Sequence, residues 1–316
     1  MEKTAFIFPG QGAQKAGMGK DFYQYSSHSR RIFDQASKVL GFSMEELCFE
    51  ENNRLDITEY TQAAMVTASM AMMAEIQNRG FLPDMTAGLS LGEYCAMIVS
   101  GVISFPDAVK VVRQRGILMQ EAVPAGQGGM AAILGLDTDK IEAVISSEED
   151  VQIANYNCPG QIVISGKKEA VELACVKLKE AGAKRAVILN VSGPFHSAML
   201  FDAGKKLAKV LADIEFKSPV IPYVTNVTAE FVTDSNKGES QSVNQIKQLL
   251  EQQVSSSVRW QQSIEKMIAA GAGRFVEIGP GKTLTAFVRK ISRDVQVYNV
   301  ETWQDLEKLE KLRKAR

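Results

Sequence analysis

The chain has 316 residues, of which 45% are hydrophobic and 23% charged, with a formal net charge of −1. This is a globular composition, and a chain of this length buries a large core in one domain or in one domain that carries an insert. The balanced charge gives no general attraction for nucleic acid or for an anionic membrane, so neither is expected as a partner. The longest apolar stretch, residues 63–74, is shorter than a bilayer span, and the N-terminus lacks a signal-peptide pattern, which predicts a cytoplasmic protein.

The first third of the chain alternates strand, glycine-containing loop and helix. Residues 5–8 predict a short buried strand, residues 9–12 break it, and helical patterning begins near Asp21. Asp56 followed by Glu59 resembles a capping box, which predicts the start of a long helix that runs to Arg79. Small and flexible apolar side chains cover most of this helix, so we expect it to pack on several sides. The pattern indicates an α/β fold.

A different pattern occupies residues 126–195. The predicted order is β-α-β-β-α-β, the ferredoxin-like unit, and a glycine-rich entrance precedes it. Its predicted elements are residues 130–136, 139–146, 151–156, 161–165, 167–181 and 184–189. After it, α/β alternation resumes, with apolar segments at 220–224 and 274–278, helices at 243–253 and 258–270, and a charged terminal stretch at 305–316. We therefore predict a large α/β domain formed by residues 1–125 and 196–316, with a small domain at 126–195.

Three patterns that suggest a ligand do not hold. The four cysteines are far apart and form no C-x-x-C pair, which favours buried reduced thiols over a zinc site or a disulfide framework. The segment 279–283 resembles a phosphate loop, but Val276 stands where that loop requires glycine. The loop at 10–12 has Lys15 where a dinucleotide fingerprint requires its third glycine. No metal site and no permanently bound cofactor are predicted.

Residues 88–92, Gly-Leu-Ser-Leu-Gly, match the G-x-S-x-G pattern of a nucleophile elbow. The match follows an extended stretch at 85–87 and precedes a helical run at 94–99, which is the strand, turn and helix context that an elbow requires. Glycines two positions on either side of Ser90 permit a sharp turn that exposes its hydroxyl. The alternative is an ordinary turn in which Ser90 caps the following helix.

A serine nucleophile needs a general base, and the chain has two histidines. His28 lies in a polar helical segment and is expected to be a solvated surface residue. His196 lies at the end of the inserted domain, where a loop can reach the elbow. We therefore pair His196 with Ser90.

Arg115 lies on the apolar stripe of a predicted helix, three residues after Val112 and four before Met119. A guanidinium on an apolar face must find an anion, since an unpaired buried charge costs several kcal/mol. One interpretation is an internal salt bridge. The other is a planar fork that binds a substrate carboxylate through two hydrogen bonds.

Together these motifs resemble the malonyl-CoA:acyl carrier protein transacylase family. The resemblance rests on segments in the same order along nearly the whole chain, namely residues 6–12, 88–92, 115–116, 155–161, 193–197 and 276–281. It implies a hydrolase-like parallel-sheet core with a ferredoxin-like insert. It also implies that malonyl-CoA is the substrate and acyl carrier protein the partner.

The resemblance further implies a role for each motif. Ser90 would attack the malonyl thioester while His196 takes its proton, and Arg115 would hold the free malonyl carboxylate. Backbone N–H groups of Gln11 and Leu91 would stabilise the oxyanion. A backbone carbonyl orients the histidine in this family, and Gln253 is the matching position, which makes a dyad and not a triad.

Two pocket positions bear on acyl selectivity. Leu89 stands where many family members have a histidine directly before the nucleophile, so a polar group is removed from the acyl pocket. Phe195, before the histidine, is similar to members that select malonyl. For the acidic carrier protein we predict a basic rim formed by Lys184, Arg185 and Lys282.

Three alternatives remain open on the sequence. Fatty acid synthesis is the predicted pathway, and a trans-acting acyltransferase of a polyketide synthase uses the same chemistry. An α/β-hydrolase esterase would need an acid such as Asp107 or Asp150. A catalytically silent module that docks carrier protein is the alternative outside enzymes.

Overall fold

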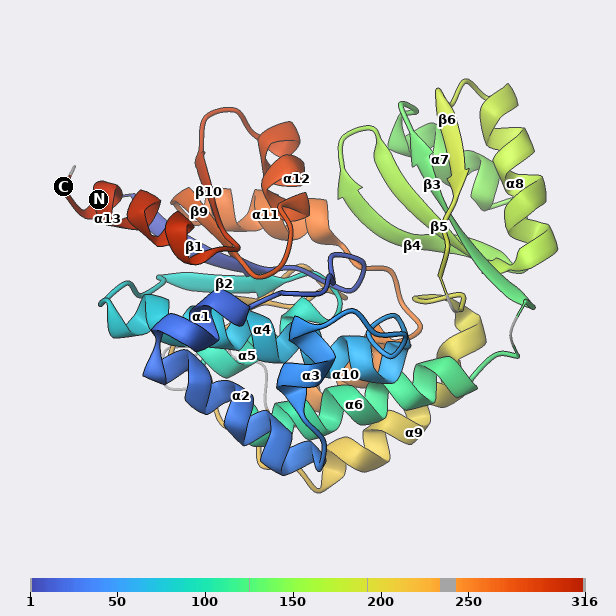
Figure 1. Ribbon diagram of the computed structural model, residues 1–316. Helices are drawn as coiled ribbons and strands as arrows, with labels where there is room; N and C mark the ends of the chain where they lie inside the picture. Colours follow the sequence, from blue (N-terminus) through green and yellow to red (C-terminus); the bar gives the residue numbers. More distant parts are fainter. Residues whose placement is uncertain (1, 125, 192, 234–242, 315–316) are drawn as a thin grey trace.

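The computed structural model describes residues 2–124, 126–191, 193–233 and 243–314, and its strands form two separate sheets (Figure 1). The larger sheet has the order β10-β9-β1-β2-β7-β8, and all its neighbours are parallel except β7 and β8. The smaller sheet is antiparallel, with the order β4-β5-β3-β6. The predicted α/β fold with a mostly parallel sheet is confirmed. The strands of the larger sheet are β1 (Lys3–Phe8), β2 (Met85–Gly88), β7 (Tyr223–Val224), β8 (Phe231–Val232), β9 (Ala272–Ile278) and β10 (Gln296–Val300).

Helices cover both faces of the larger sheet (Figure 1). Successive side chains of β1 point to opposite faces, so Ala5 and Ile7 pack with α11 (Trp260–Ala269) and α12 (Thr283–Ile291). Phe6 and Phe8 pack on the other face, where the central helix is α4 (Thr58–Asn78). The remaining helices of this part are α1 (Lys20–Tyr25), α2 (Ser27–Leu40), α3 (Met44–Phe49), α5 (Gly92–Val99), α6 (Phe105–Glu121), α9 (Phe201–Ala212), α10 (Val243–Gln253) and α13 (Leu306–Lys314), with short 3₁₀ turns at Ala198–Leu200 and Trp303–Asp305.

Helix α4 forms the centre of the core, as its small and flexible side chains predicted. Every side chain from residue 61 to residue 73 is buried. The predicted capping box at its start is wrong, because the N-cap is Ile57 and no side chain caps it. Asp56 instead accepts a hydrogen bond from Gln14 Nε2 at 3.1 Å. The carboxylate is therefore used to hold the loop after β1.

The smaller sheet and its two helices follow the predicted element order, with boundaries that differ by at most two residues. A parallel bridge between Asn155 and Val258 joins its edge strand β4 to the segment before α11. Met130 of β3 and Leu189, which follows β6, line one cavity together with residues that follow β1 and β2 of the larger sheet. Its elements are β3 (Gly128–Leu134), α7 (Thr138–Ile145), β4 (Val151–Cys158), β5 (Gln161–Lys167), α8 (Lys168–Glu180) and β6 (Arg185–Ile188).

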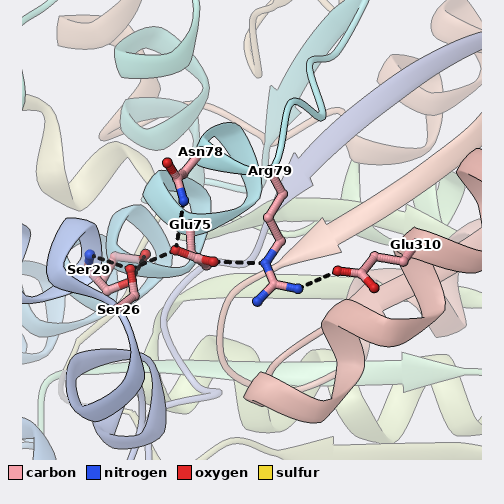
Figure 2. Close-up of polar contacts among 7 residues, drawn as sticks. Ser26, Ser29, Glu75, Asn78, Arg79 and Glu310 are labelled. Atoms are coloured by element: carbon pink, nitrogen blue, oxygen red, sulfur yellow. Dashed lines mark hydrogen bonds and ion pairs between the residues drawn. The ribbon is translucent and has the colours of Figure 1, made fainter.

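The C-terminal helix α13 is attached to the end of α4 by a chain of charges (Figure 2). Buried Glu75 accepts hydrogen bonds from Ser26 Oγ at 2.7 Å and from Arg79 Nε at 2.8 Å. The same guanidinium donates to Glu310 of α13 at 2.5 Å and lies over the ring of Trp303. The charged terminal stretch at 305–316, for which the sequence left a helix or a frayed tail open, is helical through α13, and positions 315 and 316 lie outside the described residues.

Two further findings concern the cysteines and the lengths of the apolar helices. All four cysteines are buried and free, as predicted. Within the described part of the chain, no helix has the length and apolarity needed to cross a membrane.

Candidate active site

The parallel register of β1 and β2 brings two loops together at one edge of the larger sheet. Phe8 pairs with Gly88, so the loop that contains Gln11 and the turn that contains Leu91 leave the sheet side by side. Leu89 N donates to Phe8 O at 3.0 Å and fixes this contact. The strand order changes direction beside β1: β2 follows on one side of it, and β9 and then β10 follow on the other. Ligands of open α/β sheets bind at such a point, outside the carboxyl ends of the strands.

Ser90 occupies a strained turn. Its φ of 53° lies in the left-handed region, which non-glycine residues rarely adopt. A Cβ on Gly88 would lie 1.9 Å from the backbone of Gly92, and a Cβ on Gly92 would lie 2.2 Å from Phe8 O, so the turn requires both glycines. The N-cap of α5 is Leu91, without a side-chain hydrogen bond, so the helix-cap interpretation of Ser90 is wrong.

Ser90 Oγ lies 2.7 Å from His196 Nε2, and His196 Nδ1 lies 2.8 Å from the backbone oxygen of Gln253. A carbonyl only accepts, so Nδ1 carries the proton and Nε2 is free to accept the serine proton. Burial, followed by the charge of Arg115, lowers the pKa of His196 to about 4. The imidazole is therefore neutral at physiological pH and has the state that a general base needs. His28 lies on α2 and is partly exposed, away from this site.

Arg115 is 1% exposed and points at Ser90 from α6. Its guanidinium donates to Gln62 Oε1 at 2.9 Å, to Gln253 Oε1 at 3.0 Å and to Ser90 Oγ at 3.2 Å. Burial lowers the pKa of Arg115. None of the salt bridges found among the described residues includes Arg115, so the interpretation as an internal salt bridge is wrong. The charge lies among neutral amide groups, and its Nε has no hydrogen-bond partner.

Two residues that the sequence analysis missed complete the polar network. Asn226, which follows β7, accepts from Ser90 N at 2.5 Å and donates to Gly88 O at 2.7 Å. Glu93, on the first turn of α5, is 2% exposed, and burial raises its pKa to about 7. Helical spacing places Glu93 on one stripe with Ala96 and Met97, a signal that a carboxyl group is buried here. No comparable signal marks Asn226, because the sequence does not show that β7 pairs with β2.

A cavity of about 620 Å³ opens at Ser90, and both sheets line it. Leu89 and Phe195 form part of its apolar wall. Gln11 and Leu91 also line it, and neither donates its backbone N–H in the hydrogen bonds of the described residues. The small sheet and the turn after it contribute Met130, Asn155, Asn157, Val163, Leu189, Asn190 and Val191.

The structure does not bring the three predicted docking residues together at the cavity. Lys184 and Arg185 are exposed at the start of β6, and Arg185 pairs with Leu134. Leu189, which lines the cavity, lies four residues further on, about 13 Å along the strand. Only Lys282 is next to a cavity residue, Thr283. The basic rim for carrier protein therefore stays a prediction. The positions of Lys184 and Arg185, away from the cavity, do not support their part in it.

The chain matches the family model described as "Acyl transferase domain" over residues 5–311. It belongs to this family. The malonyl CoA-acyl carrier protein transacylase of Bacillus subtilis (strain 168) is 45% identical over 312 residues, which cover 97% of this chain and 96% of that protein. The crystal structure of malonyl CoA-acyl carrier protein transacylase from Clostridium perfringens has a TM-score of 0.93 and 44% identity, covering 99% and 98% of the two chains. The predicted resemblance is therefore confirmed, and the chain is an acyltransferase.

One solved structure is a complex. It contains a malonyl-transacylase with its type II PKS acyl-carrier protein, and it matches this acyltransferase with a TM-score of 0.91 and 39% identity, over 96% of this chain and 98% of that one. The similarity extends through both sheets, because the shared region is nearly the whole chain. The division into two sheets is thus common to these acyltransferases.

Proposed function

We propose that this acyltransferase moves a malonyl group from malonyl-CoA to the phosphopantetheine thiol of acyl carrier protein, for fatty acid synthesis. The observation that carries the proposal is Arg115, a buried cation 3.2 Å from the nucleophile with no carboxylate partner. An acyl group on Ser90 that ends in a carboxylate supplies the missing anion. The names of the relatives from Bacillus subtilis and Clostridium perfringens support the same substrate.

In the first half-reaction, Ser90 Oγ attacks the thioester carbonyl of malonyl-CoA and His196 Nε2 takes the hydroxyl proton. The carbonyl electron pair moves to the oxygen, and the backbone N–H groups of Gln11 and Leu91 donate to this oxyanion. When the tetrahedral intermediate collapses, the C–S bond breaks and the CoA thiolate leaves, protonated by His196. The product is a malonyl ester of Ser90.

The second half-reaction repeats these steps with a different thiol. His196 takes the proton of the phosphopantetheine thiol, and the sulfur attacks the malonyl ester. As the tetrahedral intermediate collapses and the C–O bond breaks, His196 returns the proton to Ser90 Oγ. Water would compete for the ester, and the largely buried position of Ser90 and His196 limits its access. The two halves share one site, which makes the kinetics ping-pong.

Arg115 selects the acyl group. Its two Nη atoms now donate to amide oxygens of Gln62 and Gln253, and these neutral acceptors are weaker partners than a carboxylate. In a malonyl ester, one methylene separates the free carboxylate from the ester carbonyl. This carboxylate accepts charge-assisted hydrogen bonds from Arg115, which an acetyl group cannot do. Leu89 and Phe195 close the apolar part of the pocket, which favours a small unbranched chain.

The two sheets correspond in this proposal to two domains. The antiparallel sheet with α7 and α8 forms a ferredoxin-like domain at residues 126–195, supported by the strand order β4-β5-β3-β6. Residues 1–125 and 196–316 form the hydrolase-like domain with the nucleophile. The cavity between them suits an extended pantetheine arm. Four buried free cysteines favour the reducing cytoplasm as the location.

The esterase alternative lacks its acid. Asp107 Oδ2 accepts from Ser104 Oγ at 2.7 Å at the start of α6, and Asp150 pairs with Lys167 at 2.7 Å. His196 Nδ1 faces the Gln253 carbonyl instead. A silent docking module is also disfavoured, since such a module has no need for a strained serine hydrogen-bonded to a neutral histidine.

Intact mass spectrometry after mixing with malonyl-CoA tests the proposal. We expect a malonyl adduct on the parent protein, none on Ser90→Ala, and discharge of the adduct by holo acyl carrier protein. Holo carrier proteins from a fatty acid and from a polyketide system, compared by kcat/KM, distinguish the two pathways. A parent that stays unmodified contradicts the acyltransferase mechanism, and equal loading of acetyl and malonyl groups contradicts the selectivity.

A further inference from the structure

Glu93 is a buried carboxyl group that the reaction steps do not use. Its Oε2 accepts one hydrogen bond from Gln253 Nε2 at 2.7 Å and one from Asn226 N at 3.1 Å. The charged groups whose fields reach it are Arg115 on α6 and, when ionised, the buried phenols Tyr94 and Tyr223. No salt bridge involving Glu93 is found in the described part of the chain. Burying a carboxyl group this way costs free energy, so a role is expected for it.

The first partner, Gln253, contacts each reactive group. Its backbone oxygen accepts from His196 Nδ1 at 2.8 Å, and its side-chain Oε1 accepts from Arg115 at 3.0 Å. Its Nε2 donates to Ser90 O at 3.0 Å as well as to Glu93. The amide of glutamine has almost the same shape after a half-turn, so its neighbours must decide which end faces which way. Arg115 only donates and ionised Glu93 only accepts, which keeps Oε1 towards Arg115 and Nε2 towards Glu93.

The second partner, Asn226, fixes the nucleophile turn. Its Oδ1 accepts from Ser90 N and its Nδ2 donates to Gly88 O, so one side chain bridges both ends of the strained segment. Glu93 holds the backbone N–H of this same residue. One carboxyl oxygen is thereby connected, through two residues, to the serine, the histidine and the arginine.

We propose that Glu93 is a positioning residue that keeps Ser90, His196 and Arg115 in one common geometry through Gln253 and Asn226. The inference rests on the proposed function, because malonyl transfer needs the nucleophile Ser90, the base His196 and the carboxylate anchor Arg115 to be aligned at the same time. Losing Glu93 leaves two buried N–H groups without an acceptor, and the Gln253 amide loses one of the groups that fix its orientation. Groups that orient residues in contact with substrate change rates by about 10- to 100-fold, the range known for the outer shell of metal sites.

Four variants test the proposal. Glu93→Ala removes both hydrogen bonds. Glu93→Gln keeps an oxygen that can accept them but has no charge. Glu93→Asp keeps the charge on a side chain that is shorter by one methylene. The matched control is Glu75→Ala, which also removes a buried carboxyl group (Figure 2). Glu75 lies 13 residues from Gln62 along α4, about 20 Å from the site.

Three rates are measured on each folded variant: malonyl loading of Ser90, acetyl loading, and labelling of Ser90 by phenylmethanesulfonyl fluoride, which reports the dyad without malonyl. For Glu93→Ala we expect loading and labelling to slow about 10- to 100-fold, mainly in kcat, and the malonyl over acetyl preference to fall. Glu93→Gln should load at least about threefold faster than Glu93→Ala, since it retains the acceptor. Glu75→Ala should lower the Tm and keep the parent's rates.

Parental rates and selectivity in folded Glu93→Ala overturn the inference and leave the proposed function intact. If Glu93→Ala does not fold, Glu93→Asp decides, and parental rates in that variant overturn the inference. Slowing of Glu75→Ala by the same factor also overturns it, because the effect would then come from general destabilisation. If the parent is never malonylated, the proposed function fails, while the labelling rates still test whether Glu93 aligns the dyad.

Discussion

His196 Nδ1 lies 2.8 Å from the backbone oxygen of Gln253, so an uncharged group orients the imidazole. A carboxylate in this place would stabilise the imidazolium ion and raise the pKa of the histidine. The carbonyl does so only weakly, and burial together with the Arg115 charge lowers the pKa to about 4. The resting site therefore favours a neutral histidine.

Malonyl loading of Ser90 should accordingly persist into acid. A histidine with the ordinary pKa of about 6.5 is mostly protonated at pH 5.5 and inactive as a base. With a pKa near 4, His196 stays neutral there, so we expect the acid limb of kcat/KM to lie well below pH 6. Initial loading rates measured between pH 4.5 and 8 by rapid quench and intact mass give the profile.

The variant Glu93→Gln separates this limb from titration of Glu93, whose pKa burial raises to about 7. The acid limb should be retained in Glu93→Gln if it belongs to His196. A limb centred at or above pH 6.5 in both proteins would contradict the neutral, buried base.

Arg115→Ala should lose most malonyl loading and keep acetyl loading. Removing one partner of a buried charge pair costs about 2 to 5 kcal/mol, so malonyl kcat/KM is expected to fall at least about 30-fold. Arg115→Lys keeps the charge but has no planar fork, and should recover only part of the loss. Both acyl groups are compared by competition at equal CoA ester concentrations.

The control for this series is Arg113→Ala, on the same helix but turned towards Glu59 at 3.6 Å. It should leave the malonyl over acetyl ratio unchanged. Equal loss of both substrates in Arg115→Ala would mean that Arg115 supports the Ser90 turn and does not bind the substrate carboxylate.

Asn226→Ala should slow both acyl groups together, because Asn226 contacts the nucleophile turn and not the acyl chain. Its two hydrogen bonds hold Ser90 at a φ of 53°. We expect kcat to fall about 10- to 100-fold for malonyl and acetyl alike. Asn226→Asp keeps the acceptor for Ser90 N and should lose less. A variant that loses malonyl alone would contradict this role.

Most of the fold followed from local patterns. The period-two and helical patterns of residues 126–195 predicted its six elements, because β3, β4 and β5 are each buried on at least one face. Strand β6 is largely exposed, and its pattern is weaker. Strand β10 was missed since four of its five side chains are partly or fully exposed, which weakens the apolar pattern. Strand β8 has only two residues and pairs antiparallel with β7, a length that leaves no period to detect.

The site was predictable where a motif or a buried charge marks it. Ser90 lies in a five-residue pattern, and Arg115 stands out as a charge on an apolar stripe. Asn226 and the side chain of Gln253 act through contacts between residues more than 130 positions apart, which no local pattern encodes. The docking residues were chosen by charge alone, and charge does not say which end of β6 faces the cavity.

Glu93 and His196 should give the stability opposite dependences on pH. The pKa of Glu93 is raised in the fold, from about 4.5 to about 7, so its contribution is present below pH 4.5 and is lost as the pH rises through 7. The pKa of His196 is lowered, so its contribution is present above pH 6.5 and is lost as the pH falls towards 4. Glu93→Gln removes only the first, and its free energy of unfolding relative to the parent should rise by about 3 kcal/mol between pH 4.5 and 8. Urea titrations of both proteins measure the difference, and a constant difference would contradict the raised pKa.

Gly116→Ala tests how closely α6 packs on α4 beside the site. Alanine in an exposed helix is more stable than glycine by about 1 kcal/mol. A Cβ at Gly116, however, would lie 2.7 Å from Glu59 Cα and 2.8 Å from Thr58 O, both backbone atoms of α4. The backbones must separate, and overpacking of this kind costs about 1 to 3 kcal/mol, so the clash outweighs the helix preference.

We therefore expect Gly116→Ala to lower the free energy of unfolding by up to about 2 kcal/mol, which is the difference between these two effects. Because Arg115 is the adjacent residue, the shift of α6 should also weaken malonyl loading more than acetyl loading. Gly129→Ala is the control, since its Cβ would meet nothing closer than Lys168 Cα at 3.6 Å, and it should change neither quantity. A stabilised Gly116→Ala protein with the parent's selectivity would show that α6 and α4 can move apart without displacing the guanidinium.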